Sequence, residues 1–145
     1  MMIRQPWDEY FINIAQHVST RSTCNRKQVG CVIVRDKTVI ATGYNGSLPH
    51  QPHCTDEGCY LVDNHCLRTV HAETNAINQA AKNGVSLDGA SIYCTLEPCW
   101  YCFKNIITSG IKKIYYKQSY GSKNQLYLSY IANQGILFKE VKSGH

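Results

Sequence analysis

The sequence contains no long apolar run. Crossing a bilayer as a helix takes about 20 consecutive apolar residues, and no such stretch occurs among the 145 residues. The opening residues 1–7 also lack the apolar stretch of a secretory signal peptide. We therefore expect a cytoplasmic protein that has no membrane partner.

The sequence also has little that would divide it into parts. Only 4 prolines occur, and no internal repeat, low-complexity tract or proline-rich linker interrupts the chain. Because 43% of the residues are hydrophobic, a chain of this length can bury one core without disulfide staples. We expect a single domain that covers residues 1–145.

Acidic residues are fewer than basic ones: Asp and Glu total 10, Lys and Arg total 15, and the net charge is +5. A positive charge of this size suits a phosphorylated ligand or a nucleic acid, but it suits an ordinary solvated surface equally well. The lysines of the C-terminal third are dispersed rather than clustered. This dispersion argues against a nucleic-acid partner.

Cysteine, in contrast, is abundant, with 8 residues. In a chain without an export signal, thiols are expected to stay reduced or to bind metal rather than to form disulfides. Cys31 and Cys94 stand within apolar runs, and we expect them to be small core residues. The remaining cysteines are candidate metal ligands.

Hydrophobic periodicity predicts an opening helix and a hairpin. Apolar residues recur at helical spacing over residues 6–20, and the β-branched runs 29–34 and 38–42 are separated by a short polar turn. From residue 43 onward the chain loses any steady period, and about 45–69 is rich in Cys and His. A loop this long in a compact domain is usually functional, and we expect metal to hold part of it.

Helices and strands alternate over the rest of the chain. The expected helices are 71–82, 98–109 and 123–133, the expected strands are 90–95, 111–117 and 136–141, and Gly84, Gly110 and Gly135 mark the helix ends. Such alternation implies parallel strands joined by helical crossovers. We predict a three-layer α/β/α sandwich with a mixed five-stranded sheet, whose ligands bind at the carboxyl ends of the strands.

Two motifs supply three metal ligands. His71-Ala72-Glu73 is followed further along the chain by Pro98-Cys99-Trp100-Tyr101-Cys102. Cys99 and Cys102, three apart in the first turn of a helix that starts at Pro98, can both reach one metal ion. With His71 they make three protein ligands, which leave the fourth zinc position to water, as is typical of a catalytic site.

Glu73 is the expected general base. His71 and Glu73 project in different directions from one helix start, so the carboxylate can stay uncoordinated beside the metal and move protons. Ala72 is small enough not to crowd the imidazole and is expected to contact the substrate, although an ordinary helix former fits there equally well. Alone, PCxxC also fits a structural zinc knuckle or a redox pair. Together with HxE, it matches the zinc-dependent nucleobase deaminases.

With these motifs the chain resembles the zinc-dependent cytidine deaminase superfamily, and within it the deoxycytidylate (dCMP) deaminases and related bacterial late-competence proteins. The resemblance covers about residues 22–120 and rests on 29–34, 43–46, 52–59, 65–69 and both zinc motifs. It implies a cytidine-deaminase-like fold and hydrolysis of dCMP to dUMP with release of ammonia, in the host cytoplasm if the chain is phage-encoded. A zinc-bound hydroxide would attack C4 while Glu73 shuttles protons.

The resemblance also implies residues that bind the substrate. Asn45 matches the asparagine that contacts the substrate sugar, although a turn asparagine would look the same in the sequence. Arg26 and Tyr120 lie where related enzymes hold the phosphate, and Arg68 and Lys117 are weaker candidates.

Regulation and assembly are implied in the same way. Family members are commonly hexamers that are activated by dCTP with Mg²⁺ and inhibited by dTTP, and Tyr44, Asn45 and Gly46 match part of the regulatory site. We therefore expect a homo-oligomer, with a hexamer favoured, that takes Mg²⁺ with its dCTP effector. Some relatives also use dCTP as a substrate, so the choice between dCMP and dCTP stays open.

A second, structural zinc ion is predicted. The loop region collects more Cys and His residues than a loop of its length has by chance, and some related deaminases carry such an ion. The predicted ligands are Cys24, Cys54, either Cys59 or Cys66, and His65.

Two other functions stay open at this point. One is a deaminase of the same fold that acts on free cytosine, on cytidine or on a tRNA adenosine. The dispersed basic residues and the Cys/His-rich loop argue against tRNA. The other is a noncatalytic zinc module that binds a partner or nucleic acid. Glu73 distinguishes the two classes, because a structural zinc site has no need of an uncoordinated carboxylate.

Overall fold

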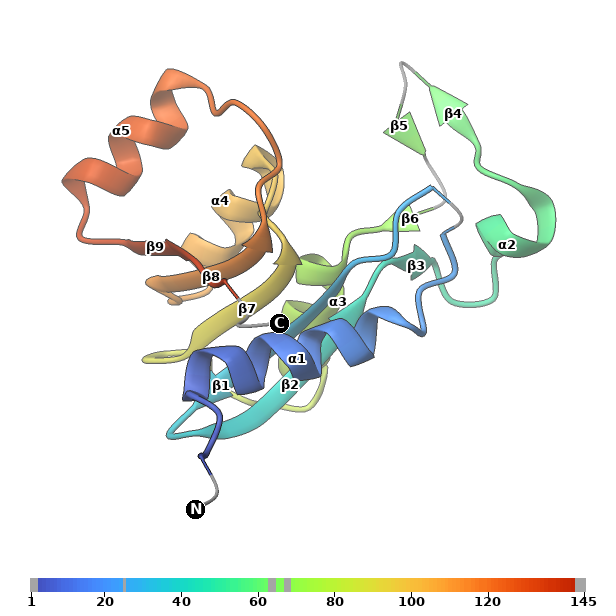
Figure 1. The fold of residues 1–145 in the computed structure, drawn as a ribbon. Helices are drawn as coiled ribbons and strands as arrows, with labels where there is room; N and C mark the ends of the chain where they lie inside the picture. Colours follow the sequence, from blue (N-terminus) through green and yellow to red (C-terminus); the bar gives the residue numbers. More distant parts are fainter. Residues whose placement is uncertain (1–2, 25, 63–64, 67–68, 143–145) are drawn as a thin grey trace.

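The structure is a computed structural model that describes residues 3–24, 26–62, 65–66 and 69–142 (Figure 1). Five strands form its main sheet: β1 Gly30–Arg35, β2 Thr38–Tyr44, β7 Ser91–Leu96, β8 Lys113–Gln118 and β9 Leu137–Glu140. Their order across the sheet is β2-β1-β7-β8-β9. β1 pairs antiparallel with β2 and β7, whereas β7, β8 and β9 run parallel. The predicted mixed five-stranded sheet is confirmed.

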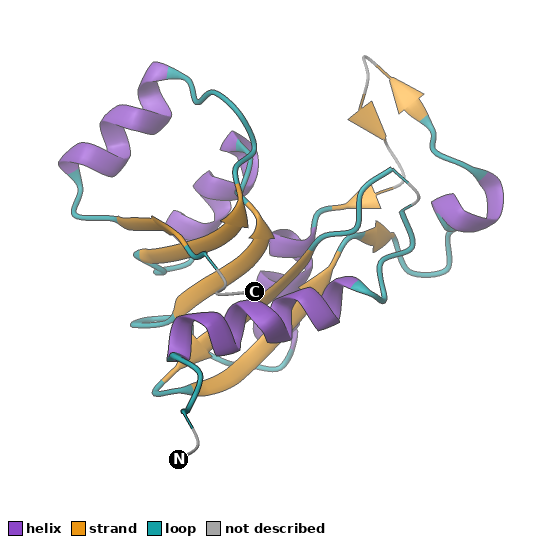
Figure 2. Ribbon diagram, viewed as in Figure 1, coloured by secondary structure: helices purple, strands orange, loops and turns teal. Residues whose placement is uncertain are grey.

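Helices cover both faces of this sheet (Figure 2). The long helices are α1 Trp7–Ser19, α3 Ala72–Lys82, α4 Trp100–Thr108 and α5 Gln125–Asn133. α1 packs on one face, and α3, α4 and α5 share the core on the other face. The predicted three-layer α/β/α arrangement is confirmed. Within the described ranges, no helix has the length and apolar character that a membrane span needs.

The two cores follow the two-residue period of the strands. In β1, Val32 and Val34 face α1, whereas Cys31 and Ile33 belong to the core under α3 and α4. All four residues are buried. Cys94 of β7 stands opposite Cys31 in register and is also fully buried. The prediction that both cysteines are core residues is confirmed.

The segment after β2 contains short elements rather than one irregular loop. These are β3 Gly46–Ser47, α2 Cys54–Glu57, β4 Leu61–Val62, β5 His65–Cys66 and β6 Thr69–Val70. β3 pairs with β6, and β4 pairs with β5. Figure 1 shows α2, β4 and β5 extending away from the five-stranded sheet.

Gly43 lies within β2, whereas the sequence suggested that a loop begins there. A Cβ atom on Gly43 would lie 2.3 Å from the carbonyl oxygen of Ala72 and 2.4 Å from the backbone nitrogen of Ala76. The glycine is therefore explained by the close approach of β2 and α3. The glycines predicted to follow helices all have positive φ, as helix-ending caps do: Gly84, Gly110 and Gly135.

All four long helices begin one or two residues later than predicted: α1 begins at Trp7 rather than residue 6, and α5 begins at Gln125 rather than residue 123. α3 begins at Ala72 rather than His71, and α4 begins at Trp100 rather than Pro98. His71 and Cys99 are the N-cap residues, with extended backbone at ψ 152° and 169°. The prediction of Pro98 as the first helical residue is therefore wrong, because the chain is still extended at Cys99, one residue further on.

Candidate active site

Three side chains that could ligate a metal ion meet at the N-terminal ends of α3 and α4. The ligand atoms of His71, Cys99 and Cys102 all lie within 4.8 Å of one another. Nδ1 of His71 is 3.2 Å from Sγ of Cys102 and 3.7 Å from Sγ of Cys99. A tetrahedral zinc ion with ordinary Zn–N and Zn–S bonds would separate such atoms by ~3.6 Å. The donor set thus fits zinc in both composition and spacing.

The local backbone explains why these side chains are available to a metal. His71 and Cys99 are N-cap residues, yet neither side chain makes a capping hydrogen bond to its helix. Cys102 lies in the first turn of α4, so its thiol faces the same side as that of Cys99. Cys99 comes shortly after the last residue of β7 and therefore lies at the carboxyl end of the parallel strands, where ligands bind in sheets of this kind.

The electrostatics of this group favour a bound cation. Hydrogen bonds from Cys102 and from His71 lower the pKa of the Cys99 thiol to about 4. Hydrogen bonding to Cys99 raises the pKa of the Cys102 thiol and also raises the pKa of the His71 imidazole. In the metal-free protein, Cys99 is therefore a thiolate near neutral pH, and the thiolate is the form of cysteine that binds metal.

Glu73 lies beside this group but is not one of its ligands. The residue is 4% exposed, and burial raises the pKa of its carboxyl above the ordinary value. Oε1 of Glu73 is 3.5 Å from Sγ of Cys31, and interaction with Cys102 partly offsets the effect of burial on the pKa of the carboxyl. A buried carboxyl next to three ligands, yet outside their set, has the placement that a proton shuttle needs.

Comparison with known proteins identifies the family. The cytidine and deoxycytidylate deaminase zinc-binding region matches residues 5–118. The chain belongs to this deaminase family. A crystal structure of dCMP deaminase from the cyanophage S-TIM5, in complex with dCMP and dUMP, is similar over 97% of this chain and 100% of that chain, with a TM-score of 0.80 and 29% identity.

Two curated relatives are also similar in sequence. ComE operon protein 2 of Bacillus subtilis is 53% identical over 119 residues, which cover 82% of this chain and 63% of that protein. Deoxycytidylate deaminase of Saccharomyces cerevisiae is 36% identical over 145 residues, covering 96% of this chain and 46% of that protein. The chain thus spans less than two thirds of either relative. The predicted resemblance to deoxycytidylate deaminases and the predicted cytidine-deaminase-like fold are confirmed.

In this structure, Asn45 holds the segment that precedes β1. Its Oδ1 accepts a hydrogen bond from the backbone N–H of Val29 at 2.9 Å, and its Nδ2 donates to the carbonyl oxygen of Lys27 at 2.7 Å. Asn45 is 5% exposed. An amide has a second donor and a second acceptor position, so the predicted sugar contact stays a prediction. The same holds for the effector role of Tyr44, Asn45 and Gly46.

Ala72 is the first residue of α3 and is 1% exposed. It belongs to the core cluster that α3 and α4 form with the sheet. Packing between α3 and β2 therefore accounts for the small side chain. The predicted contact of Ala72 with the substrate stays a prediction.

A cleft of about 800 Å³ opens at the carboxyl ends of β7 and β8, and its lining includes Lys27, Lys117 and Tyr120. Nζ of Lys27 lies 5.0 Å from the centre of the Tyr120 ring. Lys27 is a cation that the sequence analysis did not single out, although it directly follows the predicted Arg26. Arg26 is exposed and does not line the cleft, and Arg68 lies outside the described residues.

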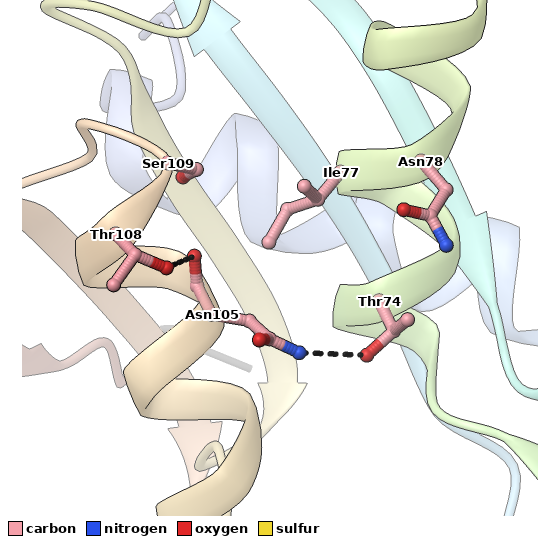
Figure 3. Close-up of a pocket in the computed structure, with 6 residues that line it drawn as sticks. All are labelled: Thr74, Ile77, Asn78, Asn105, Thr108 and Ser109. Atoms are coloured by element: carbon pink, nitrogen blue, oxygen red, sulfur yellow. Dashed lines mark hydrogen bonds between the residues drawn. The ribbon is translucent and has the colours of Figure 1, made fainter.

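A smaller pocket of about 250 Å³ lies between α3 and α4 (Figure 3). Its lining is mostly polar and consists of Thr74, Ile77, Asn78, Asn105, Thr108 and Ser109. Nδ2 of Asn105 donates a hydrogen bond of 3.5 Å to Oγ1 of Thr74 across it. The side chains of the ligand group and Glu73 line neither this pocket nor the cleft.

A second group of ligand atoms lies near α2. The sulfur atoms of Cys24, Cys54 and Cys59 are within 4.8 Å of one another. Burial raises the pKa of the Cys24 thiol, but backbone hydrogen bonds outweigh this effect and lower the pKa. Cys59, one of the two alternatives for the third cysteine, belongs to this group. The side chains of His65 and Cys66 lie outside the described part of the chain.

Proposed function

We propose that this chain is a zinc-dependent dCMP deaminase, which hydrolyses dCMP to dUMP and releases ammonia. The proposal rests on one observation: three ligand side chains stand beside the buried, uncoordinated carboxyl of Glu73. Structural zinc sites usually have four protein ligands, whereas catalytic sites have three. The similarity to the cyanophage protein, whose crystal structure contains dCMP and dUMP, supports dCMP as the substrate.

In the proposed mechanism, His71, Cys99 and Cys102 hold the ion. When bound, zinc supplies a Lewis acid that makes water nucleophilic near neutral pH. Glu73 takes a proton from the water and gives it to ring N3. As the oxygen adds at C4, Glu73 carries the second proton to the C4 amine, which leaves as ammonia, and the carboxylate is regenerated. Because Glu73 is buried, bulk water does not compete for these protons.

Substrate binding is proposed to involve residues around the cleft. Asn45 contacts the sugar and Ala72 the base, while Arg26, Tyr120 and Lys117 bind the phosphate. Lys27 adds a further positive charge beside Tyr120, which supports recognition of a monophosphate at this end of the sheet.

We further propose a second, structural zinc ion. Cys24, Cys54 and Cys59 supply three ligands, and the fourth comes from the 65–66 segment, where His65 is the predicted residue. The spacing of the three sulfur atoms supports this proposal. Such an ion would hold α2 and the hairpin of β4 and β5 against the segment that precedes β1.

Regulation and assembly complete the proposed function. The chain acts as one domain over residues 1–145 in the cytoplasm and forms a homo-oligomer, with a hexamer favoured, that has no nucleic-acid or membrane partner. dCTP with Mg²⁺ activates it and dTTP inhibits it through a site that includes Tyr44, Asn45 and Gly46.

Ammonia release from several nucleotides tests the activity and its regulation together. We expect purified protein to prefer dCMP over dCTP, CMP and deoxycytidine, and we expect dCTP with Mg²⁺ to raise the rate and dTTP to lower it. Equal turnover of deoxycytidine would remove the phosphate roles of Arg26, Tyr120 and Lys117. A preference for dCTP would favour the alternative substrate.

A substitution at Glu73 separates an enzyme from a noncatalytic zinc module. Glu73→Gln should keep the fold and the zinc content, yet lower kcat by about 10²- to 10⁴-fold, because a general acid–base group contributes about that factor. Retained turnover with full zinc content would contradict the proposed mechanism.

Metal analysis tests the number of zinc ions. We expect two ions per chain in the unaltered protein, one ion in Cys102→Ser and one ion in Cys54→Ser. A single ion in the unaltered chain would remove the structural zinc.

A further inference from the structure

Cys31 contacts Glu73 from the neighbouring layer of the fold. Its Sγ lies 3.5 Å from Oε1 of Glu73, a hydrogen-bonding distance for sulfur. Cys31 is 0% exposed and Glu73 is 4% exposed, so water does not compete for the contact. The two residues come from β1 and α3, which pack together in one core.

The contact gives one carboxyl oxygen a partner outside the ligand group. Oε1 of Glu73 is directed to Cys31, and interaction with Cys102, which belongs to that group, lowers the pKa of the same carboxyl. The carboxyl therefore bridges β1 and the metal-ligating residues. Because Cys31 occupies the space next to Oε1, the Glu73 side chain cannot rotate toward the protein interior on that side.

We propose that Cys31 is a positioning residue, whose thiol keeps the Glu73 carboxyl in place through both proton transfers of the deamination. This inference rests on the proposed function. A thiol can donate its hydrogen to a carboxylate and can accept one from a carboxylic acid, so the contact persists when Glu73 gains a proton. Burial raises the pKa of the Cys31 thiol well above its ordinary value, so Cys31 keeps the proton that it donates.

Cys94 provides the matched comparison for this role. It stands opposite Cys31 in register, is 0% exposed and belongs to the same core cluster. The hydrogen bond to Oε1 of Glu73 comes from Cys31. Removal of either thiol costs similar packing, but only removal of the Cys31 thiol releases the carboxyl.

Three variants test the inference with dCMP as substrate: Cys31→Ala, Cys31→Ser and Cys94→Ala. We expect Cys31→Ala to lower kcat about fivefold, the order of effect of one hydrogen bond, while KM and zinc content stay unchanged. Cys31→Ser, which retains a donor and acceptor, should recover most of kcat. Cys94→Ala should lower the unfolding temperature about as much as Cys31→Ala and leave kcat unchanged. Equal kcat in both alanine variants, or failure of serine to recover kcat, would overturn the inference.

A spectroscopic measurement separates this inference from the proposed function. The infrared S–H stretching band of Cys31, assigned by its loss in Cys31→Ser, should shift in Glu73→Gln and stay in place in Glu97→Gln. Glu97 is also a buried carboxyl, but its partners are Lys123 and Ser119. If the protein does not turn over dCMP but the band shifts, the proposed function is refuted and the contact between Cys31 and Glu73 is supported. An unshifted band refutes the contact itself.

Discussion

The hydroxyl of Tyr127 donates a hydrogen bond of 2.7 Å to the carbonyl oxygen of Pro98. Tyr127 belongs to α5 and is 3% exposed, and Pro98 directly precedes the candidate zinc ligand Cys99. α5 therefore braces the turn that carries this ligand, although α5 itself contributes none of the ligand atoms in the described groups. Residues far from the metal-ligating group in the sequence thus hold its geometry.

Tyr127→Phe should destabilise the protein by about 1–3 kcal/mol, because it leaves a buried carbonyl oxygen without its donor. Competition with a zinc chelator should also show weaker retention of the ion. Tyr130→Phe is the control, since Tyr130 packs against the same Phe103 ring but is 38% exposed. Urea denaturation measures the stability difference, and equal midpoints for the two variants would argue against the bracing role.

A salt bridge between Lys123 and Glu97 forms a second link to the same turn. Nζ of Lys123 lies 2.5 Å from Oε1 of Glu97; the Lys123 side chain is 17% exposed and the Glu97 side chain is 1% exposed. Lys123→Met should destabilise the protein by about 3–5 kcal/mol, because it strands a buried carboxylate. Addition of Glu97→Gln to this variant should recover part of the loss. The exposed pair of Lys142 and Glu140, 4.0 Å apart, is the control, and Lys142→Met should change the unfolding free energy by less than about 0.5 kcal/mol.

Gly43→Ala should disturb both stability and activity. The new Cβ atom would meet backbone atoms of Ala72 and Ala76 at 2.3 and 2.4 Å, so β2 and α3 must separate. We expect a loss of about 3 kcal/mol together with lower kcat, because Glu73 lies in the first turn of α3. Gly89→Ala introduces only backbone strain at φ 73°, with no heavy atom within 4 Å of its Cβ. It should therefore lower stability by about 1 kcal/mol and leave kcat unchanged.

Thiol reactivity of the metal-free protein should depend on pH through Cys99. A pKa lowered to about 4 means that the thiolate is lost only below about pH 4, so alkylation of Cys99 should be nearly constant from pH 5 to 8. An ordinary thiol instead reacts faster as the pH rises toward about 8.5. Peptide mass spectrometry after iodoacetamide treatment distinguishes the two profiles. Zinc should protect Cys99, and Cys102, whose pKa is raised, should react slowly in the same sample.

The sequence predicts the ligand group well because its signals are local. Metal-ligand residue types stand at short, regular spacing in both motifs, and a strand lies between the two helices that carry them. The helix starts were less predictable. His71 and Cys99 have extended backbone because they cap helices while their side chains turn to the ligand group, and residue type alone does not distinguish a cap from a first-turn residue. The proximity of Cys59 to Cys24 and Cys54 likewise depends on where α2 and its flanking residues lie.

Periodicity and ligand chemistry were sufficient to predict the layers, the strand types and the grouping of His71, Cys99 and Cys102, since each depends on local residue patterns in the chain. Tertiary packing alone decided which residues hold the Glu73 carboxyl and the turn that precedes Cys99. Cys31 is the partner of Glu73, Lys123 of Glu97, and Tyr127 of Pro98. A hydrogen bond reaches about 3 Å. Which distant side chain comes within that reach is set by strand order and helix packing, and neither leaves a periodic mark in the sequence.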